Sequence, residues 1–145
     1  MLKLIDTSEH FFGDEPIIRI LDIGSAKGLV KQASDSRIQK FASNLTPAPD
    51  KIFVHILAMG ASEWWGSNLN LDTFPEENLI ACHKTFEINP AYIYRHHVNK
   101  DPRTSMGKII FSIYNERMHR VELVGEIDRV KGRDIVERIE RGDFP

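Results

Sequence analysis

Two adjacent histidines, His96 and His97, are the residues of this sequence whose type and spacing most directly suggest chemistry. They lie in a polar stretch that ends at Asp101 and Pro102, and a strongly β-forming run begins at Gly107. Histidine changes its charge state near neutral pH, so it often serves as a general base or a metal ligand. Two solvated loop residues would give the same pattern, so residue type alone leaves both interpretations open.

The residues that follow the pair resemble those of a known family. A His-x-Asn-x-Asp-Pro element runs from His97 to Pro102, and Gly107 precedes a strand. Beyond that strand, residues 114–124 read Tyr-Asn-Glu-Arg-Met-His-Arg-Val-Glu-Leu-Val. Together these motifs resemble the prohead maturation proteases of large tailed bacteriophages, which are serine proteases related in fold to the herpesvirus capsid protease, assemblin. The resemblance extends over residues 52–142, most of the chain.

The resemblance implies that His97, not His96, is the catalytic histidine, because the family's histidine stands two residues before the asparagine. In the family the serine nucleophile follows the next helix, in a Val-Ser-Met-Gly-like segment, and this chain ends at Pro145, where that segment would begin. The complete protein is thus expected to be a serine endopeptidase that cleaves scaffold and major capsid proteins. It would act inside the assembling prohead, in the host cytoplasm, without a cofactor or metal. The 145-residue chain by itself is expected to be inactive.

A third group would orient the imidazole of His97. In the relatives this group is a second histidine or an acid, and it can follow the serine. Within the chain Glu122 is a candidate, whereas Asp101 stands too close in sequence to be preferred. None of the chain's serines lies in the family's nucleophile context, and Ser105 and Ser112 are expected to be a turn residue and a strand residue. The serines of the chain are Ser8, Ser25, Ser34, Ser36, Ser43, Ser62, Ser67, Ser105 and Ser112.

Two further functions are compatible with these residues. A noncatalytic protein of the same fold would bind scaffold or capsid protein through its barrel and loops, and the absent serine favours this alternative. A small metal-dependent hydrolase would use His96 and His97 with one of three other histidines. No HExxH or Cys-His spacing supports that alternative. The candidates for this third ligand are His55, His83 and His119.

Composition places the chain among soluble single-domain proteins. Its 145 residues are 41% hydrophobic and 28% charged, which suits one domain over residues 1–145. A net charge of −2 offers no basic excess for nucleic acid, and no run approaches a membrane span. The single cysteine, Cys82, excludes an internal disulfide and is expected to be a small buried residue.

Hydrophobic periodicity predicts an α+β protein with about six strands and three or four helices. The strands are expected at 1–5, 16–23, 51–59, 107–114 and 119–127, and the helices near 26–33, 38–45, 73–83 and 133–141. The strands at 107–114 and 119–127 should form a hairpin. The family resemblance, not periodicity, selects a mostly antiparallel β-barrel, closed or partly closed and wrapped by helices. The lost serine strand would leave a hairpin edge unpaired, so we expect a homo-oligomer at micromolar concentration.

A long polar loop, residues 61–75, carries both tryptophans. It resembles the family segment in which an aromatic residue precedes an Asn-x-Asn-Gly-Asp-like run and a Phe-Pro. Leu71 stands where a glycine is common, so the turn is expected to differ. The loop is either a flap beside the substrate groove or a segment that its tryptophans anchor to the core.

Overall fold

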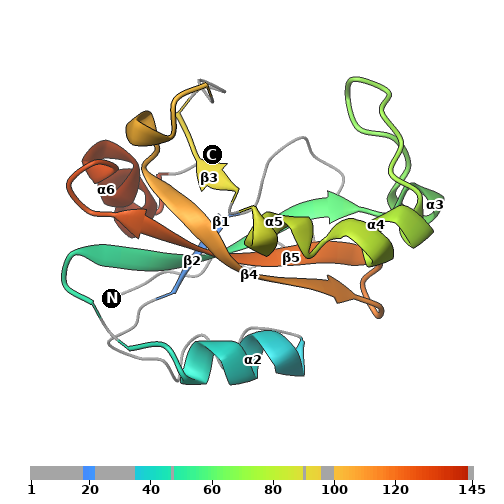
Figure 1. Cartoon of the computed structure of the whole chain (residues 1–145), viewed down its shortest axis with the longest axis horizontal. Coiled ribbons are helices and arrows are strands. Elements are labelled where there is room, and N and C mark those ends of the chain that lie inside the picture. The colour runs from blue at the N-terminus through green and yellow to red at the C-terminus, as the bar shows by residue number, and fades with distance from the viewer. Residues whose placement is uncertain (1–17, 22–34, 47, 90, 96–99, 144–145) are drawn as a thin grey trace.

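The computed structural model describes residues 18–21, 35–46, 48–89, 91–95 and 100–143 (Figure 1). The elements are β1 (Ile18–Leu21), α2 (Ser36–Ser43), β2 (Lys51–Gly60), α3 (Ser62–Trp65), α4 (Glu76–Cys82), α5 (Thr85–Ile88), β3 (Tyr92–Ile93), the 3₁₀ helix η2 (Pro102–Thr104), β4 (Gly107–Asn115), β5 (Arg120–Asp128) and α6 (Arg133–Arg141). The strand expected at 1–5 and the helix expected near 26–33 fall outside the described residues.

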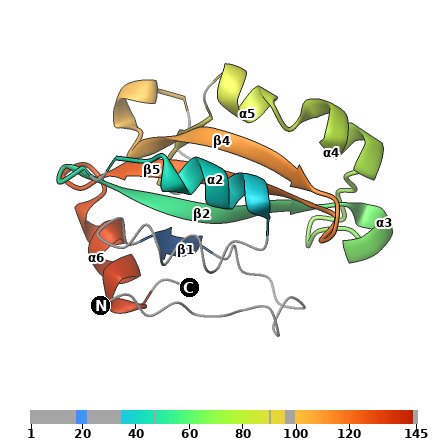
Figure 2. The same ribbon diagram turned by 90° about the horizontal axis from the view of Figure 1, so that it is seen from below.

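The strands form one sheet in the order β1-β2-β5-β4-β3, and every neighbouring pair is antiparallel. The register shifts between Leu57 and Met59 of β2 and between Ile109 and Phe111 of β4. Such bulges bend strands and increase their twist, and the sheet curls into a half-barrel (Figures 1 and 2). The expected mixture of helices with a mostly antiparallel, partly closed sheet is therefore confirmed.

One face of the sheet is covered by α2 (Figure 2). Asp35 caps this helix by accepting a hydrogen bond from the Arg37 backbone N–H at 2.8 Å. Ile38 and Ala42, one helical turn apart, are buried against a cluster that includes Phe53 of β2. This packing holds the helix on the sheet, because a helix of eight residues is marginal by itself.

The opposite face is covered by α6 at one end and by α4 and α5 at the other (Figure 1). Val136 and Ile139 of α6 pack on Val54 and Ile127 of the sheet. Gly142 ends α6 with a left-handed φ of 75°, which a residue without a Cβ adopts at little cost. The helix predicted at 133–141 is confirmed.

The hairpin of β4 and β5 is also confirmed. We expected one edge of the hairpin to be unpaired, but three backbone groups on the outer side of β4 have hydrogen-bond partners. Central β5 pairs with β2 on one side and β4 on the other. On the outer side of β4, the Ser112 N–H donates to Glu87 at 2.6 Å, and the Ser112 carbonyl accepts from Lys84 at 2.7 Å. The Tyr114 carbonyl accepts from Arg37 at 2.6 Å. Side chains of neighbouring helices thus replace a partner strand at these positions.

The prediction that Cys82 is buried is wrong. Cys82 is exposed, because α4 buries only Leu79 against the sheet and its last turn lies at the surface.

Candidate functional site

His97, the predicted catalytic residue, and its neighbour His96 lie outside the described residues, but the segment that carries them is fixed at both ends. Tyr92 and Ile93 pair with Lys108 and Gly107 at the edge of the sheet. The Met106 N–H also donates to the Ile93 carbonyl at 2.8 Å. The residues on either side of the segment 94–105 are therefore paired with each other at the edge of the sheet.

The flanks of this segment are tied by two arginines. The Arg95 guanidinium forms an ion pair with Asp134 of α6, which joins the start of the segment to that helix. On the other flank Asp101 caps η2 and binds the Arg103 guanidinium at 2.9 Å. The Arg103 hydrogen bonds hold the pKa of Asp101 below its ordinary value. Asp101 thus has Arg103 as its partner at the surface of the protein.

Glu122, the other candidate for the orienting acid, has no exposed surface. Its carboxylate lies 2.9 Å from His55 Nε2 and accepts hydrogen bonds from Asn115 Nδ2 at 2.9 Å and Arg120 Nε at 2.8 Å. Burial raises the pKa of Glu122, but the hydrogen bonds and charges of His55 and Arg120 outweigh it and lower the pKa to about 2. The structure places Glu122 in a buried polar network within the sheet, with its carboxylate already bound.

The three histidines that lie within the described ranges have separate surroundings. His55 belongs to the buried network, His83 Nδ1 lies 2.8 Å from Ser112 Oγ, and His119 Nδ1 lies 2.8 Å from Glu76 Oε1. In the described part of the chain, no three His, Cys, Asp or Glu side chains are placed to hold a metal ion. Ser112 is a strand residue, as expected, and with no exposed surface its pairing with His83 is out of reach of a substrate.

A half-exposed cluster at the β4–β5 turn was not predicted from the sequence. His119 and Tyr114 both hydrogen bond to Glu76 Oε1, at 2.8 and 2.5 Å, and the His119 ring stacks on Trp64 with a centroid separation of 3.7 Å. The hydrogen bonds from Tyr114 and His119 lower the pKa of Glu76, whereas burial and Glu76 raise the pKa of Tyr114. The sequence contains the Met-His-Arg run and the two tryptophans, but it gives no indication that these residues contact one another.

Contacts near this cluster bear on whether the tryptophan loop is a flap or a segment anchored to the core. Trp65 Nε1 donates to the Met118 carbonyl at 2.9 Å, so Trp65 anchors the loop to the hairpin. Trp64 remains 61% exposed although it stacks on His119. Leu71 has a left-handed φ of 66°, so the turn keeps the conformation that glycine favours at this position.

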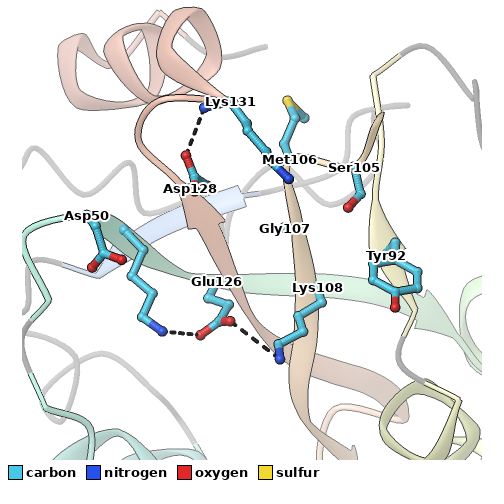
Figure 3. Close-up of a pocket in the computed structure, with 10 residues that line it drawn as sticks. Asp50, Tyr92, Ser105, Met106, Gly107, Lys108, Glu126, Asp128 and Lys131 are labelled. Carbon is cyan, nitrogen blue, oxygen red and sulfur yellow. Dashed lines mark hydrogen bonds and ion pairs between the residues drawn. The ribbon is translucent and has the colours of Figure 1, made fainter. Parts of the chain in front are cut away.

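A shallow pocket of about 220 Å³ lies at the base of the histidine segment. Figure 3 shows that it is bordered by the beginnings of β2 and β4, the end of β5, and β3. Its lining residues are Asp50, Lys51, Tyr92, Ser105, Met106, Gly107, Lys108, Glu126, Asp128 and Lys131. Gly107 is required by the close approach of two strands, because a Cβ there would lie 1.8 Å from the Glu126 carbonyl oxygen.

Two of the three acids that line this pocket, Glu126 and Asp128, already have partners. Glu126 pairs with Lys51 at 2.9 Å and with Lys108 at 3.8 Å, and the first of these contacts raises the pKa of Lys51. Asp128 accepts hydrogen bonds from the backbone N–H groups of Lys131 and Val130, each at 2.8 Å, which lower its pKa. The pocket is polar and closely connected to the segment that bears His97.

No protein-family model matches the chain, and neither a curated protein nor a solved structure is significantly similar to it. Among the helices that the structure describes, none is long and apolar enough to cross a bilayer.

Proposed function

We propose that this chain is the histidine-bearing part of a phage prohead maturation protease with a herpesvirus-protease-like fold. The observation that carries the proposal is the His-x-Asn-x-Asp-Pro element, from His97 to Pro102, in a segment whose two ends meet at the edge of a curled antiparallel sheet. A catalytic base must be held in one geometry relative to its nucleophile. The pairing of the two flanks of the segment, Ile93 and Met106, at the edge of the sheet supports such a role.

In the proposed mechanism His97 takes the proton from a serine hydroxyl while that oxygen attacks the scissile carbonyl. It then returns the proton to the leaving amine, and water hydrolyses the acyl-enzyme in a second round. The proposal requires a nucleophilic serine, which none of the serines in residues 1–145 supplies in the family's sequence context. Helix α6 supports this arrangement, because Asp134 ties it to Arg95 and Val136 packs it on the sheet. A segment that follows α6 would start from a position fixed relative to the histidine segment.

The substrates would be scaffold and major capsid proteins inside the assembling prohead. The second candidate, a noncatalytic assembly protein that binds the same partners, is favoured by a different observation. Large apolar side chains stand exposed on and beside the tryptophan loop, with Trp64 at 61%, Leu69 at 74% and Leu71 at 80%. Such side chains often mark protein-binding surfaces.

The decisive experiment uses this chain together with the segment that supplies the serine required by the proposal. His97→Ala should abolish cleavage of scaffold and capsid proteins, because the serine would lose its base, whereas His96→Ala, the matched control, should reduce it less. Gel analysis of maturing proheads measures both. A larger loss in the His96 variant would assign the base to the wrong histidine. Full cleavage with both variants would leave the noncatalytic alternative.

A further inference from the structure

Three side chains that line the pocket carry hydrogen-bond donors without a partner among the residues that the structure describes. They are the hydroxyl groups of Ser105 and Tyr92 and the ammonium group of Lys131. Figure 3 shows the Ser105 hydroxyl and the Lys131 ammonium pointing into the space beside Gly107. Unused donors therefore come from the end of the histidine segment, from β3 and from the turn before α6.

Ser105 is the most informative of the three. The residue is only 8% exposed, and its backbone N–H, but not its hydroxyl, has a partner within η2. A hydroxyl that no protein group satisfies takes its hydrogen-bond partner, water or a ligand, from the space that it faces. Because the Ser105 hydroxyl points into the pocket, it is available to a ligand bound there.

The charges of the pocket favour an anionic ligand, although its lysines and acids are equal in number. Glu126 is held by Lys51 and Lys108, and Asp128 is held by backbone N–H groups. Asp50 lies beside Lys51, whose pKa it helps to raise, on the side of the pocket away from Ser105 (Figure 3). The Lys131 ammonium contributes to the low pKa of Asp128 but forms no ion pair within the described ranges. On the side of the pocket that bears Ser105, the groups left over are donors, and the Lys131 ammonium among them is charged.

We propose that this pocket binds a phosphate group, with the Lys131 ammonium supplying the charge and the Ser105 hydroxyl donating a hydrogen bond. The two donors come from separate side chains beside Gly107, and a tetrahedral group can offer each of them a different oxygen. A planar carboxylate has two oxygens and is matched best by the fork of an arginine, and no arginine lines the pocket. The bound group would link the histidine segment to the turn before α6. The proposal is independent of proteolysis.

The phosphate could be free or carried on a phosphorylated side chain of another protein, because the same chemistry recognises both. Calorimetry and amide chemical shifts of the 145-residue chain should therefore be recorded with inorganic phosphate, with a phosphoserine peptide and with acetate. Saturable binding of phosphate, with shifts at residues 105–108 and 128–131, is expected. Tighter binding of the phosphopeptide would support the proposal and identify the protein-borne source.

Variants distinguish phosphate binding at this site from nonspecific attraction of phosphate to surface lysines. Lys131→Met keeps the aliphatic stem and should weaken phosphate binding about tenfold, the loss of one charge-assisted hydrogen bond. Ser105→Ala should weaken it several-fold, and the matched control Lys40→Met, at an exposed site on α2, should leave it unchanged. Lys131 is exposed, so its variant is expected to fold.

Three results would overturn the proposal. The first is no saturable binding of phosphate by the unmodified chain, in which case the Ser105 hydroxyl is satisfied by water. The second is acetate binding as tight as phosphate binding. The third is an equal loss of affinity in the Lys40 and Lys131 variants.

Discussion

Two histidine–glutamate pairs in this molecule have nearly the same distance between nitrogen and oxygen but different surroundings. His55 and Glu122 lie 2.9 Å apart within the sheet, with 5% and 0% of their side chains exposed, whereas His119 and Glu76 lie 2.8 Å apart with 27% and 31% exposed. In the core, three side chains hold the carboxylate and water cannot replace them. At the hairpin turn, water competes for the same bonds, so the pair adds little to stability. Burial, rather than distance, separates a structural pair from one that a reagent or ligand can reach.

The largest effect is expected from breaking the buried pair. Glu122→Gln keeps the volume but removes the charge and turns an NH₂ group toward one of the surrounding donors. The free energy of unfolding should fall by about 3 kcal/mol, since a buried charged partner is left uncompensated. Urea unfolding followed by circular dichroism measures this loss. The matched change Glu76→Gln at the exposed pair should cost far less, and equal losses would refute the distinction between the two pairs.

Acid should weaken the buried pair over a defined range. The pKa of Glu122 is lowered from 4.5 to about 2 in the folded protein. A lowered carboxylate pKa adds stability above the unfolded value, and this contribution is lost as the pH falls from about 4.5 toward 2. Unfolding experiments between pH 6 and pH 2, on the order of one per pH unit, should show this decline. Glu122→Gln should flatten it, and an identical pH profile for that variant would assign the decline to other groups.

The exposed pair should differ from the buried pair in chemical reactivity. Among the described residues His119 Nε2 has no partner, since Nδ1 alone is bound to Glu76. Diethyl pyrocarbonate should therefore modify His119 in the folded protein and spare His55, as peptide mass spectrometry would reveal. In urea both should react. Protection of His119 in the folded chain would mean that the stack on Trp64 closes off the ring.

The smallest expected effect is a change in the pKa of Glu76. The Tyr114 hydroxyl is the largest cause that lowers it, so Tyr114→Phe should raise the pKa of Glu76 toward its ordinary value. Carbon-detected titration of the glutamate carboxyls measures this shift. Tyr92→Phe, which removes a hydroxyl of the pocket, is the control and should leave Glu76 unchanged. No shift in the Tyr114 variant would mean that the Tyr114 hydrogen bond does not lower the pKa of Glu76.

Local pattern predicted much of the fold. The apolar run at 51–59 became β2, the alternation at 107–114 and 119–127 became the β4–β5 hairpin, and the pattern at 133–141 became α6. These elements follow from side-chain periodicity and turn residues, which act over a few positions of the chain. The bulges that curl the sheet, and the very short β3, have no comparable local signal.

The sequence by itself determined these elements, the antiparallel hairpin and the residues that could carry chemistry. Tertiary structure decided which of them meet. Alternation in β5 indicates that Glu122 and Val124 share a face of the sheet. It does not indicate that α2 covers this face or that His55 of β2 lies beside Glu122 there. The pocket at Ser105 likewise forms only because β2, β3, β4 and β5 come together at one end of the sheet. Periodicity reports the neighbours of a residue along one element, whereas burial and pairing depend on contacts between residues that lie far apart in the chain.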